Sequence, residues 1–583
     1  MKRIKYITGS FLLLILTMTG CEDPLDKENL TAIVSEDVWT IPAVAEAYVN
    51  DIYASFMPGV STGEERNTDE ALAGGINTSL ISSYLNGTMT ADSYNYYPYD
   101  GIRRMNIFLD GIDEATFDDD IKDRLKGETL FWRAWAYFRM VRAYGGVPLV
   151  LHPEDPTDDA AVFIPRSTTS ACFAQIVQDL DDAISSLPDP SGNGRIDKAV
   201  AMAFKGRVTL FAASPQFNRN NNATLWQAAY DANLAAVDYL DAQGFGLLED
   251  FSQLWVEEMN KEVIMVRRYS YPEAPNGYFQ VCIMPLKYGE SGCAHGNQPS
   301  LELVNAFPLR DGSKWDPVAR DYSVLHQDRD DRFYATIAYN GADPYLLPMF
   351  GVENMWTYYY DKDGDPNTGI NGREIRADFL DGYEARSSFY SPKMLDPNLD
   401  AVNKLDGQVD WIEIRYAEVI MNLAEAANET DAPAEALAIL YQIRDRAGIE
   451  PGAGDYGITA ATKEEIRQVI MDERFVEFAF ETKRFWDLRR WRIYKSRMEG
   501  LENSARHGLR IEWAGATEDR PTGLENIDDI WDQFLITTIE DIQPNTMLEE
   551  DKYSFFGIPA TYLDRNSKLE QNNTWGGTFD PLQ

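Results

Sequence analysis

Residues 127–144 read GETLFWRAWAYFRMVRAY and are followed directly by GGVP. Phe131, Ala134, Phe138 and Val141 recur at intervals of three and four residues, so they share one face of a helix. The two glycines and the proline that follow end the helix. This stretch therefore predicts a long helix that buries an apolar face against neighbouring helices.

Similar helical patterns lie on both sides of this stretch. They predict helices at residues 42–56, 169–187, 197–213 and 223–240, and again at 412–428, 433–447 and 463–491. Antiparallel pairs of such helices, each burying its apolar face on the next pair, form a helical solenoid of the tetratricopeptide kind. The sequence thus predicts a mainly α protein built on a scaffold of tetratricopeptide-like helix pairs.

Three stretches lack a sustained helical period. Residues 62–97, rich in Gly, Asn, Ser, Thr and Tyr, are typical of a long loop. The sequence therefore divides into a helical region that carries this loop, an irregular insertion, a returning helical region, and an irregular C-terminal region with few short strands. The expected boundaries are 42–244, 245–405, 406–492 and 493–583.

The overall charge excludes some kinds of partner. The 583 residues include 53 Lys and Arg against 94 Asp and Glu, a formal net charge of −41. A balance this acidic argues against binding nucleic acid, which needs a basic surface, and against adhesion to anionic lipid through a polybasic patch. With 44% apolar and 25% charged residues, the composition is that of a globular protein.

Residues 1–20 have the features of a lipoprotein signal peptide. A basic start precedes an apolar run at 11–16 that is too short to span a bilayer. Met18-Thr19-Gly20-Cys21 then resembles a bacterial lipobox, in which the signal is cut before the cysteine. Multiple acylation of Cys21 would anchor the protein firmly, with residues 21–41 as an acidic tether. An ordinary signal peptide is the alternative.

The remaining cysteines form no disulfide framework. Cys282 and Cys293 are close enough in sequence to pair in an oxidising compartment, and Cys172 would be left over. The hydrophobic core must therefore hold the fold together.

Eight blocks of sequence carry a family resemblance. In chain order they are Tyr99-x-x-Ile102-x-x-x-Asn106; Arg133–Phe138 with Tyr144–Leu149; Pro165-Arg166 with Asp179–Ala183; Ala213–Asn218; Arg415–Val419 with Ala424–Asn428; Ile443–Gly448; Asp472–Phe478; and Ile558-Pro559 with Asn566, Leu569 and Gln571-Asn572. Behind a lipobox, these blocks make the chain similar to the SusD/RagB family of outer-membrane lipoproteins from Bacteroidetes, over nearly all of its length.

The resemblance implies a binding protein and not a catalyst. Members of this family bind glycans at the cell surface and hand them to a SusC-like TonB-dependent outer-membrane channel, over which they lie like a lid. The implied fold is four tetratricopeptide-like helix pairs that support irregular, ligand-binding segments. The acidic run after Cys21 resembles the family's signal for display on the outer face. A solvated tether would look the same.

Aromatic residues in the irregular segments are the predicted ligand contacts. Sugar rings have apolar faces and polar rims, so a site needs aromatic side chains beside amides, carboxylates or arginines. The candidates are Tyr84, Asn86, Tyr94, Tyr96 and Tyr97 in the first loop, and Trp356, Tyr358, Tyr359 and Tyr360 in the insertion. The alternative for any one of them is that it packs its loop onto the helices.

One acidic segment is a candidate Ca²⁺ site. Asp361, Asp363 and Asp365 could supply oxygen ligands, although the spacing is not that of an EF-hand. An acidic turn without metal is the alternative. No other cofactor is predicted, because the sequence contains no zinc, nucleotide or dinucleotide motif.

Glu418 and Glu425 lie seven residues apart and hence on one helical face. They could form the acid and base of a glycosidase, but a structural pair that meets Arg415, Arg444 or Arg446 is favoured.

The sequence thus predicts a surface-exposed, lipid-anchored outer-membrane protein that binds a nutrient glycan and delivers it to a channel. Three alternatives remain: capture of a peptide or another nutrient, a surface glycosidase, and a structural member of a surface complex without a ligand of its own.

Overall fold

The computed structural model describes residues 37–60, 64–72, 82–155, 157–192, 194–276, 297–343, 354–361, 374–377, 387–395, 407–541 and 545–583. The predicted sites at Cys21, Cys282, Cys293, Asp363 and Asp365 lie outside these residues.

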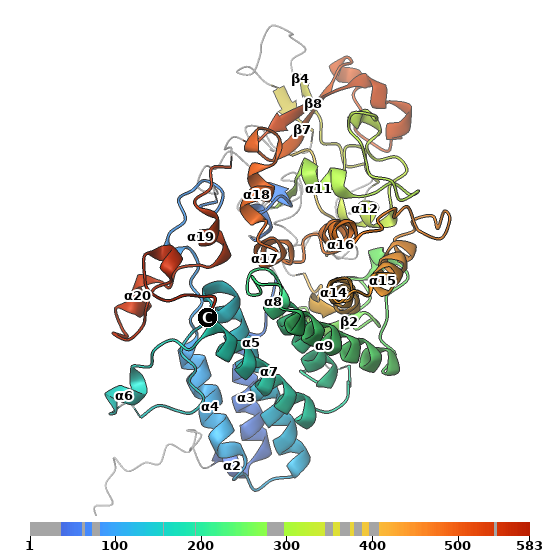
Figure 1. Ribbon diagram of the computed structural model, residues 1–583. Helices are drawn as coiled ribbons and strands as arrows, with labels where there is room; N and C mark the ends of the chain where they lie inside the picture. Colours follow the sequence, from blue (N-terminus) through green and yellow to red (C-terminus); the bar gives the residue numbers. More distant parts are fainter. Residues whose placement is uncertain are drawn as a thin grey trace, which may run out of the picture.

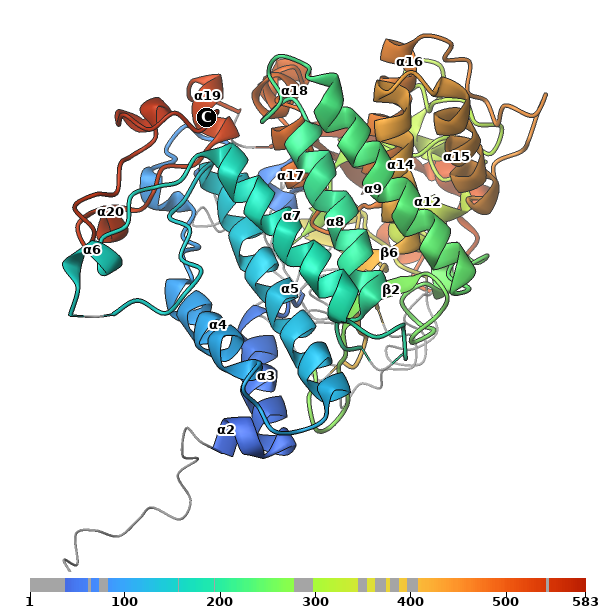
Figure 2. The same cartoon turned by 60° about the horizontal axis from the view of Figure 1, so that its bottom comes forward.

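The N-terminal half is a row of antiparallel helices (Figures 1 and 2). They are α2 (Asp37–Thr40), α3 (Pro42–Phe56), α4 (Tyr99–Ile112), α5 (Asp119–Tyr144), α7 (Thr169–Ser186), α8 (Lys198–Ala213) and α9 (Ala223–Ala242). The short helix α6 (Asp159–Val162) lies apart from this row, in the connection between α5 and α7 (Figure 2). Helix α5 packs on α7, α7 on α8 and α8 on α9. The predicted helix at 127–144 is the C-terminal part of α5, and nearly all of that part is buried.

The helical row continues after the insertion. Helix α14 (Tyr416–Glu429) packs directly on α9, and α15 (Pro433–Arg446) and α16 (Lys463–Glu477) pack on α14. The helices on either side of the insertion therefore stack as one array, as Figure 2 shows. This arrangement confirms the predicted mainly α fold of helix pairs.

Shorter helices lie in the insertion and in the C-terminal part. They are α11 (Leu301–Ala306), α12 (Asp331–Thr336), α17 (Arg484–Arg490), α18 (Tyr494–Glu499), α19 (Glu550–Ser554) and α20 (Ala560–Leu563).

The strands form three small sheets within the described residues. Strand β1 (Ala71–Leu72) pairs with β3 (Gln298–Pro299), and β2 (Val263–Arg267) pairs antiparallel with β6 (Trp411–Arg415). A four-stranded sheet has the order β5 (Glu374–Arg376), β4 (Tyr359–Asp361), β7 (His507–Trp513) and β8 (Phe534–Glu540). Its two longest strands come from the C-terminal region.

Two helix boundaries predicted from sequence were wrong. The helix predicted from residue 412 begins at Tyr416, because Trp411–Arg415 is strand β6. The single helix predicted over 463–491 breaks after Glu477. The chain turns there through left-handed conformations at Phe480 and Thr482, with φ of 63° and 59°.

Hydrogen bonds with distant segments stabilise the turn that interrupts the helix. The Nζ of Lys393 donates to the carbonyl oxygen of Ala479 at 2.8 Å and to Glu481 at 2.7 Å. The amide of Phe480 donates to the carboxyl group of Glu70 at 2.5 Å. A local helical period cannot reveal partners that lie tens or hundreds of residues away in the chain.

No helix in the described part of the chain combines the length and the hydropathy needed to cross a bilayer.

Candidate functional site

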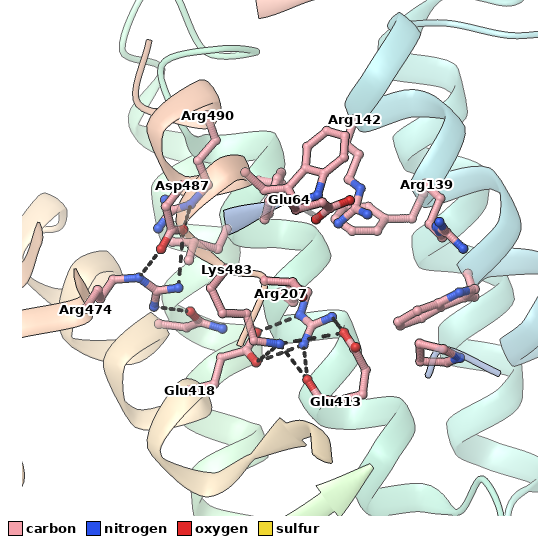
Figure 3. A pocket seen from close by; sticks show the side chains of 18 of the residues that line it. Glu64, Arg139, Arg142, Arg207, Glu413, Glu418, Arg474, Lys483, Asp487 and Arg490 are labelled. Atoms are coloured by element: carbon pink, nitrogen blue, oxygen red, sulfur yellow. Dashed lines mark hydrogen bonds and ion pairs between the residues drawn. The ribbon is translucent and has the colours of Figure 1, made fainter. Parts of the chain in front are cut away.

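A cavity of about 300 Å³ lies where helices α5 and α8 meet α14 and α17 (Figure 3). Its lining is a mixture of aromatic and charged side chains. The aromatic ones are Trp135, Phe138, Phe211, Trp411 and Trp486, and the charged ones are Glu64, Arg139, Arg142, Arg207, Glu413, Glu418, Arg474, Lys483, Asp487 and Arg490. Residues far apart in sequence therefore converge on one cavity.

The aromatic part of the wall is rigid. Trp135 and Phe138 come from α5, and Trp486 from α17. Each of the two tryptophans keeps only 4% of its surface accessible, because close-packed neighbours support the rings from behind. Met57, Gly59, Glu64, Thr482 and Lys483 are among the lining residues that stay half-exposed, and they mark the open side.

The floor of the cavity is a network of ion pairs. Arg207 on α8 binds both carboxylate oxygens of Glu418, at 2.6 and 2.8 Å, and one oxygen of Glu413 at 2.7 Å. Lys483 lies 3.2 Å from Glu418. Although burial opposes ionisation, Arg207 and Lys483 hold the pKa of Glu418 well below its usual value. This carboxylate is thus fixed in its charged, fully bonded form.

A second network lies beside the floor. Arg474 on α16 binds Asp487 at 2.9 Å. Arg490 binds Asp487 at 2.8 Å and grips Glu425 with two bonds of 2.6 and 2.7 Å. Glu418 and Glu425 are therefore structural carboxylates, as favoured from sequence, although their partners are Arg207 and Arg490 rather than the arginines expected.

The opposite wall differs from the floor, because its two arginines make no ion pair with a carboxylate in the described residues. They are Arg139 and Arg142, which extend from α5. The guanidinium of Arg142 lies 3.8 Å above the ring of Trp486, and that of Arg139 lies 3.9 Å above Tyr96. Burial lowers the pKa of Arg142. Burial also raises the pKa of Glu64, against the opposing influence of the two arginines.

The predicted contacts in the first loop pack onto the helical core. Tyr84 donates its hydroxyl to the carbonyl of Ser93 at 2.8 Å, and Asn86 accepts from Thr88. Tyr94 stacks on Phe556 and Tyr97 on Tyr562, with ring centroids 4.7 and 4.5 Å apart.

These tyrosines remain half-exposed. Two of them contact residues of the cavity wall: Tyr96 lies under Arg139, and the ring of Tyr94 packs edge-on against Trp486.

The predicted contacts in the insertion lie elsewhere in the fold. Trp356 and Tyr358 are 5% and 0% exposed, and belong to a core beside strands β7 and β8. The indole of Trp356 donates to the carbonyl of Gly523 at 3.1 Å. The structure gives both a packing role, which was the alternative open for them. Tyr359 and Tyr360 are half-exposed, under Arg510 and Arg520.

The structure therefore does not bring the two predicted sets together. The tyrosines of the first loop pack on the helical core and the insertion residues pack on another cluster. The arginines on the cavity wall were missed from sequence. Trp135, Arg139 and Arg142 are spaced as one helical stripe, but they lie in the helix at 127–144, which was predicted only to pack against neighbouring helices.

The Asp361 segment is described only in part. Asp361 ends strand β4, and its carbonyl accepts a hydrogen bond from Thr517 at 2.6 Å. Within the described ranges, no three His, Cys, Asp or Glu side chains gather in a way that could hold a metal ion. Cys172 is buried, and burial raises the pKa of its thiol to about 11.

Two family sequence models match this chain. The SusD family model matches residues 261–575, more than half of the chain. A second model, described as starch-binding associating with outer membrane, matches residues 45–210.

Individual proteins agree with these matches. A SusD-like protein of Formosa agariphila is 25% identical over 526 residues, which cover 84% of this chain and 92% of the relative. The crystal structure of a SusD-like protein from Bacteroides fragilis is 25% identical, with a TM-score of 0.70, and the match covers 92% of this chain and 98% of that one.

A SusD-like carbohydrate binding protein, also from Bacteroides fragilis, has the same fold. It is 20% identical with a TM-score of 0.70, over 91% of this chain and 100% of that one. The family models, the relatives and the architecture agree, and the chain belongs to the SusD family.

Proposed function

We propose that this protein binds a nutrient glycan at the outer face of the outer membrane and delivers it to a TonB-dependent channel, without breaking any bond. Its membership of the SusD family supports this role, as does the shared fold with a carbohydrate binding protein. Acylation of Cys21 would supply the anchor, and the channel would be the partner in transport.

The observation that carries the proposal is the mixed aromatic and charged lining of the cavity between α5, α8, α14 and α17, which we call the α5–α17 cavity. Trp135, Phe138 and Trp486 supply the apolar part of the lining that the C–H groups of a sugar ring would contact. One face of Trp486 is already covered by Arg142. Arg139, Arg142 and the carboxylate of Glu64 supply partners for its polar rim. Such a combination of aromatic walls with a few placed polar groups is what a sugar requires.

The state of the deep carboxylates argues against a glycosidase. A retaining or inverting enzyme needs one carboxylate with free oxygens to attack the sugar or activate water. Both oxygens of Glu418 are bound by Arg207, and those of Glu413 accept from Arg207 and, at 3.2 Å, from Trp411. Neither can act without first breaking these bonds.

A glycan-array binding assay on the soluble form starting at Glu22, with and without Ca²⁺, tests the proposal. Binding of a glycan whose chain stays intact after incubation is expected. Release of sugar products would establish the glycosidase instead. Binding of peptides but no glycan would favour capture of another nutrient, and binding of the channel alone would favour a structural role.

A separate measurement, of the melting temperature with and without Ca²⁺, tests the acidic segment. We propose that Asp361, Asp363 and Asp365 bind a structural Ca²⁺ through carboxylate oxygens. Ca²⁺ should then raise the melting temperature of the protein, and Asp363→Asn should abolish that rise. An unchanged melting temperature in Ca²⁺ would contradict the site.

A further inference from the structure

The cationic side chains of the α5–α17 cavity fall into two groups. The cations of the first group, on the floor and in the network beside it, form ion pairs with carboxylates. They are Arg207, Arg474, Lys483 and Arg490. Arg139 and Arg142, on the facing wall, have no such partner among the described residues. They lie three residues apart on α5, on the same side of the helix, and Figure 3 shows both at the cavity.

The lining also contains buried donors without a hydrogen-bond partner. Within the described residues these are Trp135 Nε1, Arg142 Nε and Asn422 Nδ2. The indole N–H of Trp486, by contrast, interacts with the carboxyl group of Glu64. Buried donors without acceptors are costly, so the cavity is complementary to a group that only accepts.

Aromatic rings position the guanidinium groups of Arg139 and Arg142. The guanidinium of each arginine lies close over the centre of an aromatic ring, Arg142 over Trp486 and Arg139 over Tyr96. This contact restrains the group, and no ion pair with a carboxylate occupies its N–H groups within the described residues. The N–H edge of a guanidinium matches the geometry of a carboxylate or a sulfate, which it can bind through two parallel hydrogen bonds.

We propose that the cavity takes an anionic sugar, and that Arg139 and Arg142 hold its carboxylate or sulfate group. This inference rests on the proposed function and narrows its ligand to a charged glycan. A neutral sugar hydroxyl both donates and accepts, whereas an ionised carboxylate or sulfate only accepts. The charged group therefore satisfies the surplus donors, although the protein as a whole is strongly acidic.

The size of the cavity limits how much of the glycan enters. A volume of about 300 Å³ is at the lower end of small-molecule sites and admits about one sugar ring. The bound unit is therefore a chain end or a branch, and the rest of the polymer stays outside.

The charge of Glu64 lets the proposal predict whether a variant binds an anionic sugar more tightly or more weakly. The carboxylate of Glu64 lines the cavity and, within the described residues, makes no ion pair. Its negative charge repels an anion bound by Arg139 and Arg142. Removing that charge should therefore strengthen the binding of an anionic sugar and leave the binding of a neutral one nearly unchanged.

The test uses isothermal titration of the form starting at Glu22 with galacturonate, galactose 6-sulfate and galactose, at concentrations on the order of 10 mM. At least one charged sugar should bind about tenfold more tightly than galactose. Arg142→Met and Arg139→Gln should each remove that preference, and Glu64→Gln should increase it. The two charged sugars distinguish a carboxylate from a sulfate site.

Controls separate binding from folding. Arg320→Gln changes an arginine near Trp315, away from the cavity, and should keep the preference. If Arg142→Met does not fold, Glu64→Gln still tests the proposal, because this variant is expected to bind the charged sugar more tightly than wild type does. Equal binding of charged and neutral sugars, no binding of any of the three, or a preference that survives both arginine changes would overturn the proposal. A glycan from the array that binds wild type and all variants alike would leave the proposed function standing and refute only this inference.

Discussion

Arg133 on α5 and Asp179 on α7 form a two-pronged ion pair, with Nε to Oδ2 and Nη2 to Oδ1 both at 2.8 Å. Arg133 also donates to Asn106, whose amide donates in turn to the carbonyl of Val150. These contacts join three of the sequence blocks that identified the family. In these three blocks, Asn106, Arg133 and Asp179 thus hold the helices together.

Replacing Asp179 by Asn should destabilise the protein strongly. The change leaves the guanidinium of Arg133 buried without a countercharge, which costs about 3–5 kcal/mol. Chemical denaturation measures the loss. Asp181→Asn, on the same helix, is the matched control. Its carboxylate is 46% exposed and pairs with Lys205 at the surface, so a change within about 1 kcal/mol is expected. Similar losses in the two variants would contradict this role of the pair.

Trp356 should behave as a core residue. Trp356→Ala removes a ring that packs near Tyr358 and Phe534, so a loss of about 3–5 kcal/mol in unfolding free energy is expected. Tyr359→Ala, a half-exposed neighbour, should change the melting temperature little. If Trp356→Ala kept full stability and lost glycan binding, the packing role would be wrong and the original ligand prediction right.

Stability should fall as the pH rises from about 4.5 to about 8, because of Glu70. Burial raises the pKa of Glu70 to about 8, and nearby Arg484 and Lys393 only partly offset burial and the charge of Asp69. Between its usual pKa of 4.5 and 8, the folded protein keeps a proton that the unfolded chain has lost. Unfolding free energy therefore decreases with pH in this range, by up to about 1.4 kcal/mol per unit.

Glu70→Gln should flatten that slope in denaturation curves measured from pH 5 to 9. Burial and the charge of Glu70 also raise the pKa of its neighbour Glu65, so part of the slope should remain. The exposed Glu273→Gln is the control and should leave the slope as in wild type. A wild-type stability that is constant across this range would contradict the account.

Cys21→Ala should release the protein from the membrane. Acyl chains on the cysteine are the only proposed anchor, and no helix in the described part of the chain could span a bilayer. Fractionation of cells that express both forms measures the effect. Retention of the variant in the membrane fraction at the wild-type level would refute lipidation at this residue.

Local patterns predicted the helices well where the neighbouring helices are their main partners. The stripe of Phe131, Ala134, Phe138 and Val141 packs inside the core as expected. Prediction failed where distant residues decide the conformation. Trp411–Arg415 is a strand because β2 pairs with it, and the break after Glu477 depends on Glu70 and Lys393.

The candidate site was harder to predict for the same reason. Glu64 follows α3, Arg142 ends α5 and Trp486 lies on α17, and only the folded chain brings them to one cavity. Sequence reasoning favoured aromatic residues in irregular segments, whereas most residues that line the cavity come from helices. Its surplus of donors is invisible until each hydrogen bond can be followed to its partner.

A crystal structure of the form starting at Glu22, bound to the glycan that the array selects, tests the central claim most directly. The account predicts an intact sugar in the α5–α17 cavity, between Trp135 and Trp486, with its polar rim on Arg139 and Arg142. A glycan bound only beside Tyr359 and Tyr360, with the cavity empty, would contradict the assignment of the site. A cleaved sugar would contradict the claim that the protein binds without catalysis.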